Sequence, residues 1–340
     1  MGSAEIHNSA GTATKASRQS FRSILIGERI REEGNCIRFR RAAGGQLAEQ
    51  AAGIIFRFCG LAAVLGVAFI TLYMIISGTP ALFRVGLKEI LFGRVWMPTA
   101  EEPRFGILYV ILTSFGGTAL AVLLGAPVGI LTAVFLAEKA DRRAAEIFKF
   151  AVELLACIPS VIYGLLGLYL LNPLIYRLEL RIFADSESHR FTGGSNLLSA
   201  VIVLAIMILP TVISVSETAI RAVEPDIRAA SLALGASRMQ TVFRAVLPAA
   251  KPGIVTAVVL GVGRALGEAT AVTLVSGGSV DFPLPFHSVR FLTTAIVSEM
   301  GYAQGAHREM LFTIGLVLFL FNMAVNIGLN RILKERGRGL

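Results

Sequence analysis

The sequence runs LLSAVIVLAIMILPTVISVSE from Leu197 to Glu217, and its only charged residue is the last one. The stretch holds 21 residues, and about 20 helical residues suffice to cross the hydrocarbon layer of a bilayer. Its apolar side chains cover every face of a helix, whereas surface helices of soluble proteins alternate an apolar stripe with a polar face. The stretch therefore predicts a membrane-spanning α-helix.

Five further runs of the same kind occur along the chain. They are Ile54–Ser77, Phe105–Ala137, Phe150–Tyr176, Gly253–Ser276 and Met310–Asn330. The second is too long for one upright span and contains Pro127, so we expect a tilted or kinked helix there, or a span followed by a surface segment. Only 16% of the 340 residues are charged, against about 25% in a typical soluble domain. We predict an all-α membrane protein with about six transmembrane helices.

The polar segments between these runs differ in basic charge. When they are placed alternately on two sides, one side carries 21 lysines and arginines and the other carries 8. Cytoplasmic loops hold the excess of basic residues, so we expect both termini in the cytoplasm. The expected parts are a basic tail (1–50), a first transmembrane helix with an extracytoplasmic loop (51–104), a core of five transmembrane helices (105–330) with a large inner loop (218–252), and a short cytoplasmic tail (331–340).

The basic tail and the cysteines allow only general predictions. The stretch Phe21–Ile30 of the basic tail is compatible with a helix on the inner membrane surface or with disorder. The three cysteines, Cys36, Cys59 and Cys157, have no paired spacing, so we expect free thiols that act as small apolar residues.

The sequence contains none of the common motifs for catalysis or cofactor binding. It has no phosphate-binding P-loop, and the glycine cluster at 261–267 misses the dinucleotide-binding spacing by one residue. The four histidines, His7, His189, His287 and His307, are expected in the tail and the outer loops, without metal-ligand spacing. We therefore expect no catalytic residue, no metal and no cofactor. The net charge of +9 is spread over short loops, unlike the basic face of a nucleic-acid-binding domain.

The inner loop from Arg221 to Lys251 predicts two short helices. Pro225 and Asp226 suit the first turn of one helix and Gly235 suits its end. Ser237 and Gln240 have the spacing of a capping box that starts the second. We expect Pro248 and Pro252 to stop this second helix before the next span.

The second loop helix has an apolar stripe at helical spacing. Its members are Met239, Val242, Phe243 and Val246. Such a stripe fits a docking element for a cytoplasmic partner, and it equally fits a helix pair that lies on the membrane surface. The pattern alone leaves both interpretations open.

The fifth run places Arg264 near mid-membrane, where an arginine costs at least ~2.5–3.5 kcal/mol. Glu268 follows at i+4, so we expect both on one helical face as an ion pair. The pair either braces two helices or lines a polar path for an anion, because the planar guanidinium suits phosphate geometry. Two rows of small residues at four-residue spacing predict close helix packing. They are Gly253, Ala257, Gly261 and Ala265, and beside them Gly263 and Gly267.

The inner loop resembles the EAA loop of bacterial ABC-importer permeases. The resemblance lies in Ala229-Ala230-Ser231, Gly235 and Leu247-Pro248. It implies that these residues, with Phe243 on the helix from Ser237 to Leu247, dock onto a separate ATPase subunit. Ala229 stands where the family has a glutamate, which leaves open which side chain anchors that contact.

Three spans resemble those of PstC, the phosphate-importer permease family, over roughly residues 50–335. The matching stretches are Glu153–Leu165, Ala205–Pro210 and Leu260–Glu268. The resemblance implies a type I ABC importer permease fold in the bacterial cell membrane, with Arg264 and Glu268 on the translocation pathway of inorganic phosphate. It also implies three partners: a PstA-like second permease, a PstB-like ATPase dimer and a PstS-like extracytoplasmic phosphate-binding protein.

Two alternatives remain beside this interpretation. A secondary transporter or channel would share the spans and the buried charges but would not need the two-helix loop. An importer of another oxyanion, such as sulfate or molybdate, would share every feature, because one arginine does not distinguish these anions.

Overall fold

The computed structural model describes residues 43–336. The stretch Phe21–Ile30, Cys36, His7 and most of the basic tail lie outside the described residues. The chain divides into two units, residues 1–69 and 70–340. The first described helix, α2 (Ala43–Val85), begins in the first unit, and its part from Ile70 onward belongs to the second.

Six helices of the described residues are long and apolar enough to cross a membrane, as the sequence predicts. They span Glu49–Val85, Leu108–Lys139, Ser160–Ile182, Leu197–Arg221, Arg238–Gly267 and Gly305–Gly328. The free cysteines Cys59 and Cys157 are both exposed; Cys59 lies in the first of these six helices, and Cys157 lies just before the third. The second of these helices continues without a break through Pro127 as α4 (Leu108–Val134), and it ends in a π-helical turn (Phe135–Lys139).

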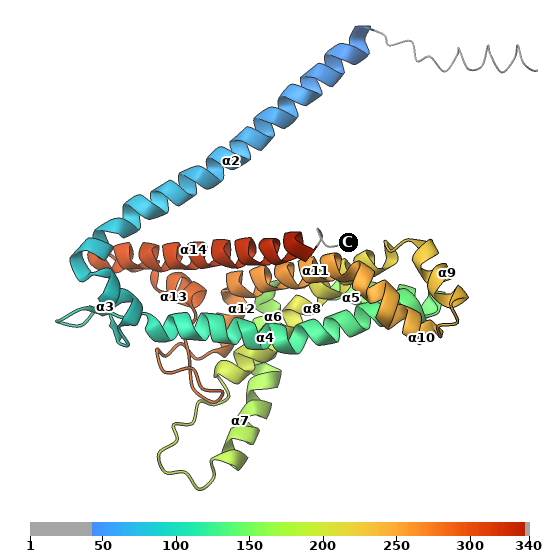
Figure 1. The fold of residues 1–340 in the computed structure, drawn as a ribbon. Helices are drawn as coiled ribbons and strands as arrows, with labels where there is room; N and C mark the ends of the chain where they lie inside the picture. The colour runs from blue at the N-terminus through green and yellow to red at the C-terminus, as the bar shows by residue number, and fades with distance from the viewer. Residues whose placement is uncertain (1–42, 337–340) are drawn as a thin grey trace, which may run out of the picture. The chain divides into compact units, whose positions relative to one another are not determined.

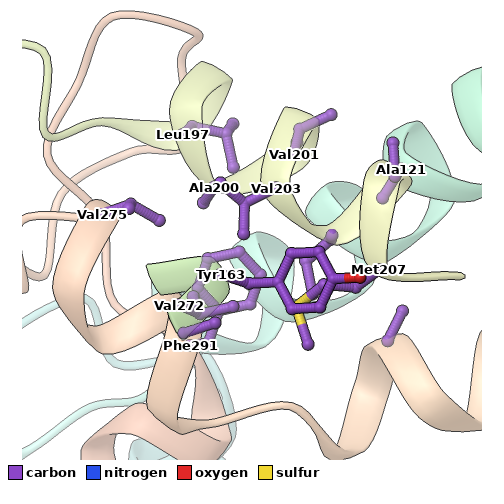
Figure 2. Close-up of a cluster of buried hydrophobic side chains, with 14 of the residues drawn as sticks. Ala121, Tyr163, Leu197, Ala200, Val201, Val203, Met207, Val272, Val275 and Phe291 are labelled. Carbon is purple, nitrogen blue, oxygen red and sulfur yellow. The ribbon is translucent and has the colours of Figure 1, made fainter. Parts of the chain in front are cut away.

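The core of the second unit forms around α8 (Leu197–Arg221), which packs most extensively against α4 and α11 (Leu247–Gly267). In Figure 1 these helices lie alongside α14 (Gly305–Arg336). Figure 2 shows the middle of this core, where the Tyr163 ring lies among side chains such as Met207 and Val272. The most apolar of the six candidate spans in the described residues, Leu197–Arg221, is therefore also the most buried of the six.

The third run is not one helix. The chain forms α5 (Arg142–Cys157), α6 (Ser160–Leu166), a π-helical turn (Gly167–Leu171) and α7 (Asn172–Ile182). Ile158 and Pro159 between α5 and α6 are extended, because a proline pushes the preceding residue out of helical conformation. The expectation of a continuous span from Phe150 to Tyr176 is therefore wrong.

The fifth run is also interrupted. Helix α11 ends at Gly267, Glu268 has an extended backbone, and α12 (Thr270–Val275) follows. Glycine is a poor helix former, and the run has two of them, Gly263 and Gly267, just before the interruption. The expected span Gly253–Ser276 is therefore two helices.

The inner loop begins as predicted and ends differently. Helix α9 (Pro225–Ala233) has its proline in the first turn, and Gly235 follows with φ +85°. The capping box of Ser237 and Gln240 is present at the start of α10 (Arg238–Thr241). This helix continues through a π-helical turn (Val242–Val246) into α11, so Pro248 and Pro252 do not stop it. The π-helical turn already alters the backbone bonding just before Pro248, which makes its missing N–H tolerable.

Short elements assemble where α4 and α14 begin. They are α3 (Leu87–Phe92), the antiparallel pair β1 (Trp96–Met97) and β2 (Arg104–Phe105), and α13 (Leu292–Glu299). The apolar side chains of these elements form a second core with the start of α14, around Ile90, Ile107 and Leu311. We call this region, together with the loops that follow α7 and α12, the loop end of the second unit.

Candidate functional site

The interruption at Glu268 is fixed by hydrogen bonds on both sides. The Glu268 carboxylate accepts from the backbone N–H of Ala271 at 3.0 Å, so the side chain caps the start of α12. Its backbone carbonyl accepts from the Thr293 hydroxyl of α13 at 2.8 Å. The interruption is therefore a built feature of the fold rather than a frayed helix end.

The expected ion pair of Arg264 and Glu268 is wrong. No ion pair between them occurs among the described residues. The i+4 argument needs a continuous helix, and Glu268 lies beyond the end of α11, where its carboxylate serves α12 instead. Arg264 is exposed in the last turn of α11, a position where a cation is favourable for the helix dipole.

Tyr163 of α6 lies beside the interruption of the third span. The Tyr163 side chain is buried, and its hydroxyl donates to the Leu155 carbonyl at 2.7 Å. This bond satisfies a carbonyl at the end of α5, just before the extended residues.

The two interrupted spans also touch directly, through α6 and α12. A Cβ at Gly164 of α6 would lie 2.8 Å from the Cα of Ala271 in α12, closer than real Cβ contacts. Non-helical backbone at membrane depth occurs where it is buried in protein or lines a water-filled cavity, and transporters use interrupted helices at their substrate sites. The paired interruptions with Arg264 and Tyr163 form a candidate translocation site.

The two rows of small residues differ in their surroundings. Gly261 is buried, and a Cβ there would lie 3.1 Å from Val212 of α8. Ala257 and Ala265 of the same row are buried too. By contrast, a Cβ at Gly263 or Gly267 would meet nothing within 4 Å among the described residues. The first row therefore packs against α8, and the second faces open space.

The inner loop exposes apolar side chains. Leu234, between α9 and α10, is 90% exposed, and Phe243 is 49% exposed. The predicted stripe is split, because Val242 and Val246 are buried against α4 and α8 while Met239 and Phe243 point outward. The loop thus presents an exposed apolar surface, which we call the loop patch. It consists of Ile227, Leu232, Leu234, Met239 and Phe243.

Polar contacts hold the loop in place. Arg228 of α9 pairs with Glu138 at 2.9 Å and also donates to the carbonyls of Val223 and Ile220. The hydroxyls of Ser231 and Thr241 lie 2.9 Å apart and join α9 to α10. Sequence reasoning missed the pair of Arg228 and Glu138, which are 90 positions apart, and no local spacing signals such a contact.

Of the other residues expected to dock an ATPase, Ala229, Ala230, Gly235 and Pro248 are exposed and Leu247 is partly buried. Each of these residues is at least partly accessible in this chain. The Ser231 hydroxyl, by contrast, is hydrogen-bonded to the Thr241 hydroxyl. The structure therefore separates a residue that shapes the loop from residues that remain free to meet a partner.

The loop end contains two buried carboxylates that sequence reasoning also missed. Glu299 accepts from the Trp96 indole at 3.1 Å, from His307 at 2.7 Å and from Arg290. His307 lies in the first turn of α14. The prediction that it lies in an outer loop is therefore wrong. Among the described residues, no three histidine, cysteine or carboxylate side chains are placed to hold a metal ion.

The second buried carboxylate, Glu179 of α7, is fully buried. It accepts from His189 at 2.9 Å and from the backbone N–H and the hydroxyl of Thr192. A hydrogen-bonded carboxylate of this kind orders the loop that supplies its donors. Glu179 therefore fixes the segment between α7 and α8.

Comparison with known proteins adds a family to this geometry. The model of the family described as "Binding-protein-dependent transport system inner membrane component" matches residues 125–336. The probable ABC transporter permease protein YqgH of Bacillus subtilis (strain 168) is 37% identical over 282 residues, covering 82% of this chain and 88% of that protein. The phosphate transport system permease protein PstC of Pasteurella multocida (strain Pm70) is 33% identical over 264 residues, covering 74% of this chain and 82% of that protein.

A solved structure with the same fold is the bacterial alginate ABC transporter in complex with an alginate pentasaccharide-bound periplasmic protein. The match has a TM-score of 0.57 and 17% sequence identity, and it covers 84% of this chain and 96% of that chain. At this identity the match carries the fold alone. It confirms the expected type I ABC importer permease fold.

Proposed function

The chain belongs to the family of inner membrane components of binding-protein-dependent transport systems, and from this premise we propose that its cargo is inorganic phosphate. It is a permease subunit of an ABC importer and not an enzyme, because ATP hydrolysis in such systems belongs to a separate subunit. The relatives named as phosphate permeases support phosphate over other oxyanions.

The observation that carries the proposal is the exposed Arg264 just before the interruption of the fifth span. The helix that follows this interruption, α12, contacts α6 of the interrupted third span. A fixed positive charge in a low-dielectric layer attracts an anion far more strongly than it would in water. Within the described part of this chain no carboxylate forms an ion pair with Arg264. An arginine without a counter-charge is therefore available for an anionic cargo.

Glu268 has a different role in this proposal from that of a counter-charge. Its carboxylate caps α12 and thereby holds the interruption open beside Arg264. Glu268 is thus a positioning residue. Glu268→Gln keeps a side-chain oxygen that accepts from Ala271, and we expect it to retain most of the uptake.

Each proposed partner is assigned to a different surface of this chain. An ATPase dimer like PstB docks on the loop patch, which then faces the cytoplasm, as both termini do. A second permease like PstA covers the exposed Arg264 face, and a phosphate-binding protein like PstS meets the loop end. The expected parts at 1–50, 51–104, 105–330 and 331–340 belong to the same proposal.

The test measures phosphate uptake and complex yield together. We expect Arg264→Gln to abolish uptake while the complex still assembles, because the amide keeps some hydrogen bonding and loses the charge. Arg177→Gln, at an exposed position of α7, is the matched control and should transport normally. Uptake near wild type in Arg264→Gln would refute the role of the charge.

The choice among oxyanions needs a separate measurement. Excess sulfate or molybdate should leave uptake of radiolabelled phosphate unchanged. Strong competition by either anion, with Arg264→Gln still inactive, would keep the site and change the cargo. This outcome separates an error in the cargo from an error in the site.

A further inference from the structure

A polar cavity of about 560 Å³ opens at the loop end, between the loop after α7 and the loop after α12. Its volume lies within the usual range of small-ligand pockets, roughly 300–1,000 Å³. Its walls carry charged, imidazole and hydroxyl groups. They include His189, Arg190, Thr192, Asp281, His287 and Ser288.

One wall of the cavity is rigidly built. The His189 side chain is only 6% exposed, and its Nε2 lies 2.9 Å from the fully buried Glu179 carboxylate. The ring stacks on Phe183 with centroids 3.8 Å apart. Thr192 donates its backbone N–H to the same carboxylate at 3.0 Å. Neither His189 nor Thr192 can turn away without leaving a buried charge unsatisfied.

The opposite wall is tied to this one through the backbone. The His287 carbonyl accepts from the Leu197 N–H at 3.0 Å, and the Ser288 hydroxyl accepts from the Ser279 N–H at 3.2 Å. The centroids of the His189 and His287 rings lie 6.5 Å apart, with the two rings tilted by 45°. The two loops therefore hold a preformed space, which lowers the ordering cost of binding.

The chemistry of the lining selects the kind of ligand. A guanidinium, two imidazoles and several hydroxyls supply hydrogen-bond donors, and guanidinium groups match oxyanion geometry. Asp281 is the one carboxylate on the lining, and it repels an anion. No cluster of metal-ligand type occurs among the described residues, which disfavours a metal ion.

We propose that this cavity is a second binding site for a small inorganic oxyanion, distinct from Arg264. Arg190 and His287 bind the anion, His189 and Thr192 shape the wall behind it, and Asp281 limits the affinity. The site goes beyond the proposed function, because it requires no passage of the anion past Arg264.

The experiment titrates the purified full chain in lipid nanodiscs with inorganic phosphate and follows binding by ³¹P NMR line broadening. All measurements use the Arg264→Gln background, so that binding at Arg264 does not contribute. We expect Arg190→Gln and His287→Gln each to weaken binding about tenfold, the loss of one charge-assisted or imidazole hydrogen bond. Arg181→Gln, at an exposed position of α7 outside the cavity, should have no effect.

Asp281→Asn gives the result of opposite sign. Removal of the carboxylate should tighten phosphate binding several-fold, because the repulsion disappears while the shape stays the same. Weaker binding in this variant would overturn the proposal and point to a cationic ligand. No binding in the Arg264→Gln background, or binding that Arg190→Gln leaves unchanged, would also overturn it. None of these three results affects the uptake test of Arg264.

Discussion

The loop end and the inner loop differ in which side chains they bury and which they expose. At the loop end, two buried carboxylates, Glu179 and Glu299, each receive hydrogen bonds from several donors within the chain. At the inner loop, the apolar side chain of Leu234 is almost entirely exposed. The loop end therefore satisfies its buried carboxylates within the chain, and the inner loop leaves apolar side chains uncovered.

This difference indicates where the chain needs a partner. A buried carboxylate is tolerable only when hydrogen-bonded or paired, so the loop end can hold its shape alone. Exposed apolar side chains that gather in one patch mark an interaction surface. We therefore propose that another protein covers the loop patch, whereas the buried hydrogen bonds at the loop end form within this chain. Four predictions test this contrast. The first three measure the stability of the isolated chain, and the fourth also measures co-purification with the ATPase.

Glu299→Leu should have the largest effect. It leaves Arg290, His307 and the Trp96 indole without their shared acceptor in a buried place. The loss of one partner from a buried pair costs about 3–5 kcal/mol, so unfolding of the purified chain should occur at much lower denaturant. The exposed Glu101→Leu is the control and should unfold like wild type. Equal stability of both variants would show that the bonds around Glu299 contribute little.

Glu179→Gln should have a smaller effect on the same measurement. The amide keeps one acceptor oxygen for Thr192 but loses the charge that faces His189. We expect a loss of about 1–3 kcal/mol in the free energy of unfolding. Glu187→Gln, exposed in the same loop, provides the comparison. An unchanged free energy of unfolding in Glu179→Gln contradicts the prediction.

Gly235→Ala should cost about 1 kcal/mol, because its φ of +85° is strained for any residue with a Cβ. Gly263→Ala should have the opposite sign and stabilise α11 by about 0.5–1 kcal/mol. A Cβ at Gly263 meets nothing within 4 Å among the described residues. Equal signs for the two variants in a denaturant titration would disprove one of these local interpretations.

Leu234→Ser should leave the isolated chain within about 0.5 kcal/mol of wild type, as exposed substitutions do. Its effect should appear only in co-purification with the ATPase, which we expect to drop severely. Leu284→Ser replaces an exposed leucine at the loop end and should leave co-purification intact. Normal ATPase capture by Leu234→Ser, or an equal loss in both variants, would remove the loop patch as the docking surface.

The sequence predicts features that depend on local spacing. The six apolar helices, the capping box of Ser237 and Gln240, and the turn at Gly235 were all predictable, because each depends on residues within a few positions. The interruption at Pro159 has a local signal in the proline itself, yet it lies inside a run whose hydropathy favours one continuous span.

The remaining features depend on contacts between distant segments. The i+4 spacing of Arg264 and Glu268 indicated an ion pair, but the Thr293 bond to the Glu268 carbonyl comes from 25 positions away. The contacts of Glu299 with Trp96 and of Arg228 with Glu138 span 203 and 90 positions. Such contacts follow from the packed fold, and no periodicity in one segment encodes them.

The π-helical turn at Val242–Val246 has a consequence for the direction in which the loop patch faces. A π-helical turn holds one more residue than an α-helical turn, and each residue of an α-helix advances by about 100° around its axis. With this extra residue, Val242 and Val246 face the core while Phe243 faces outward. Deletion of one residue there, such as Ala245, would swing the α9–α10 hairpin by about a quarter turn around the axis of α11. The direction in which the loop patch faces therefore depends on the five residues of this π-helical turn.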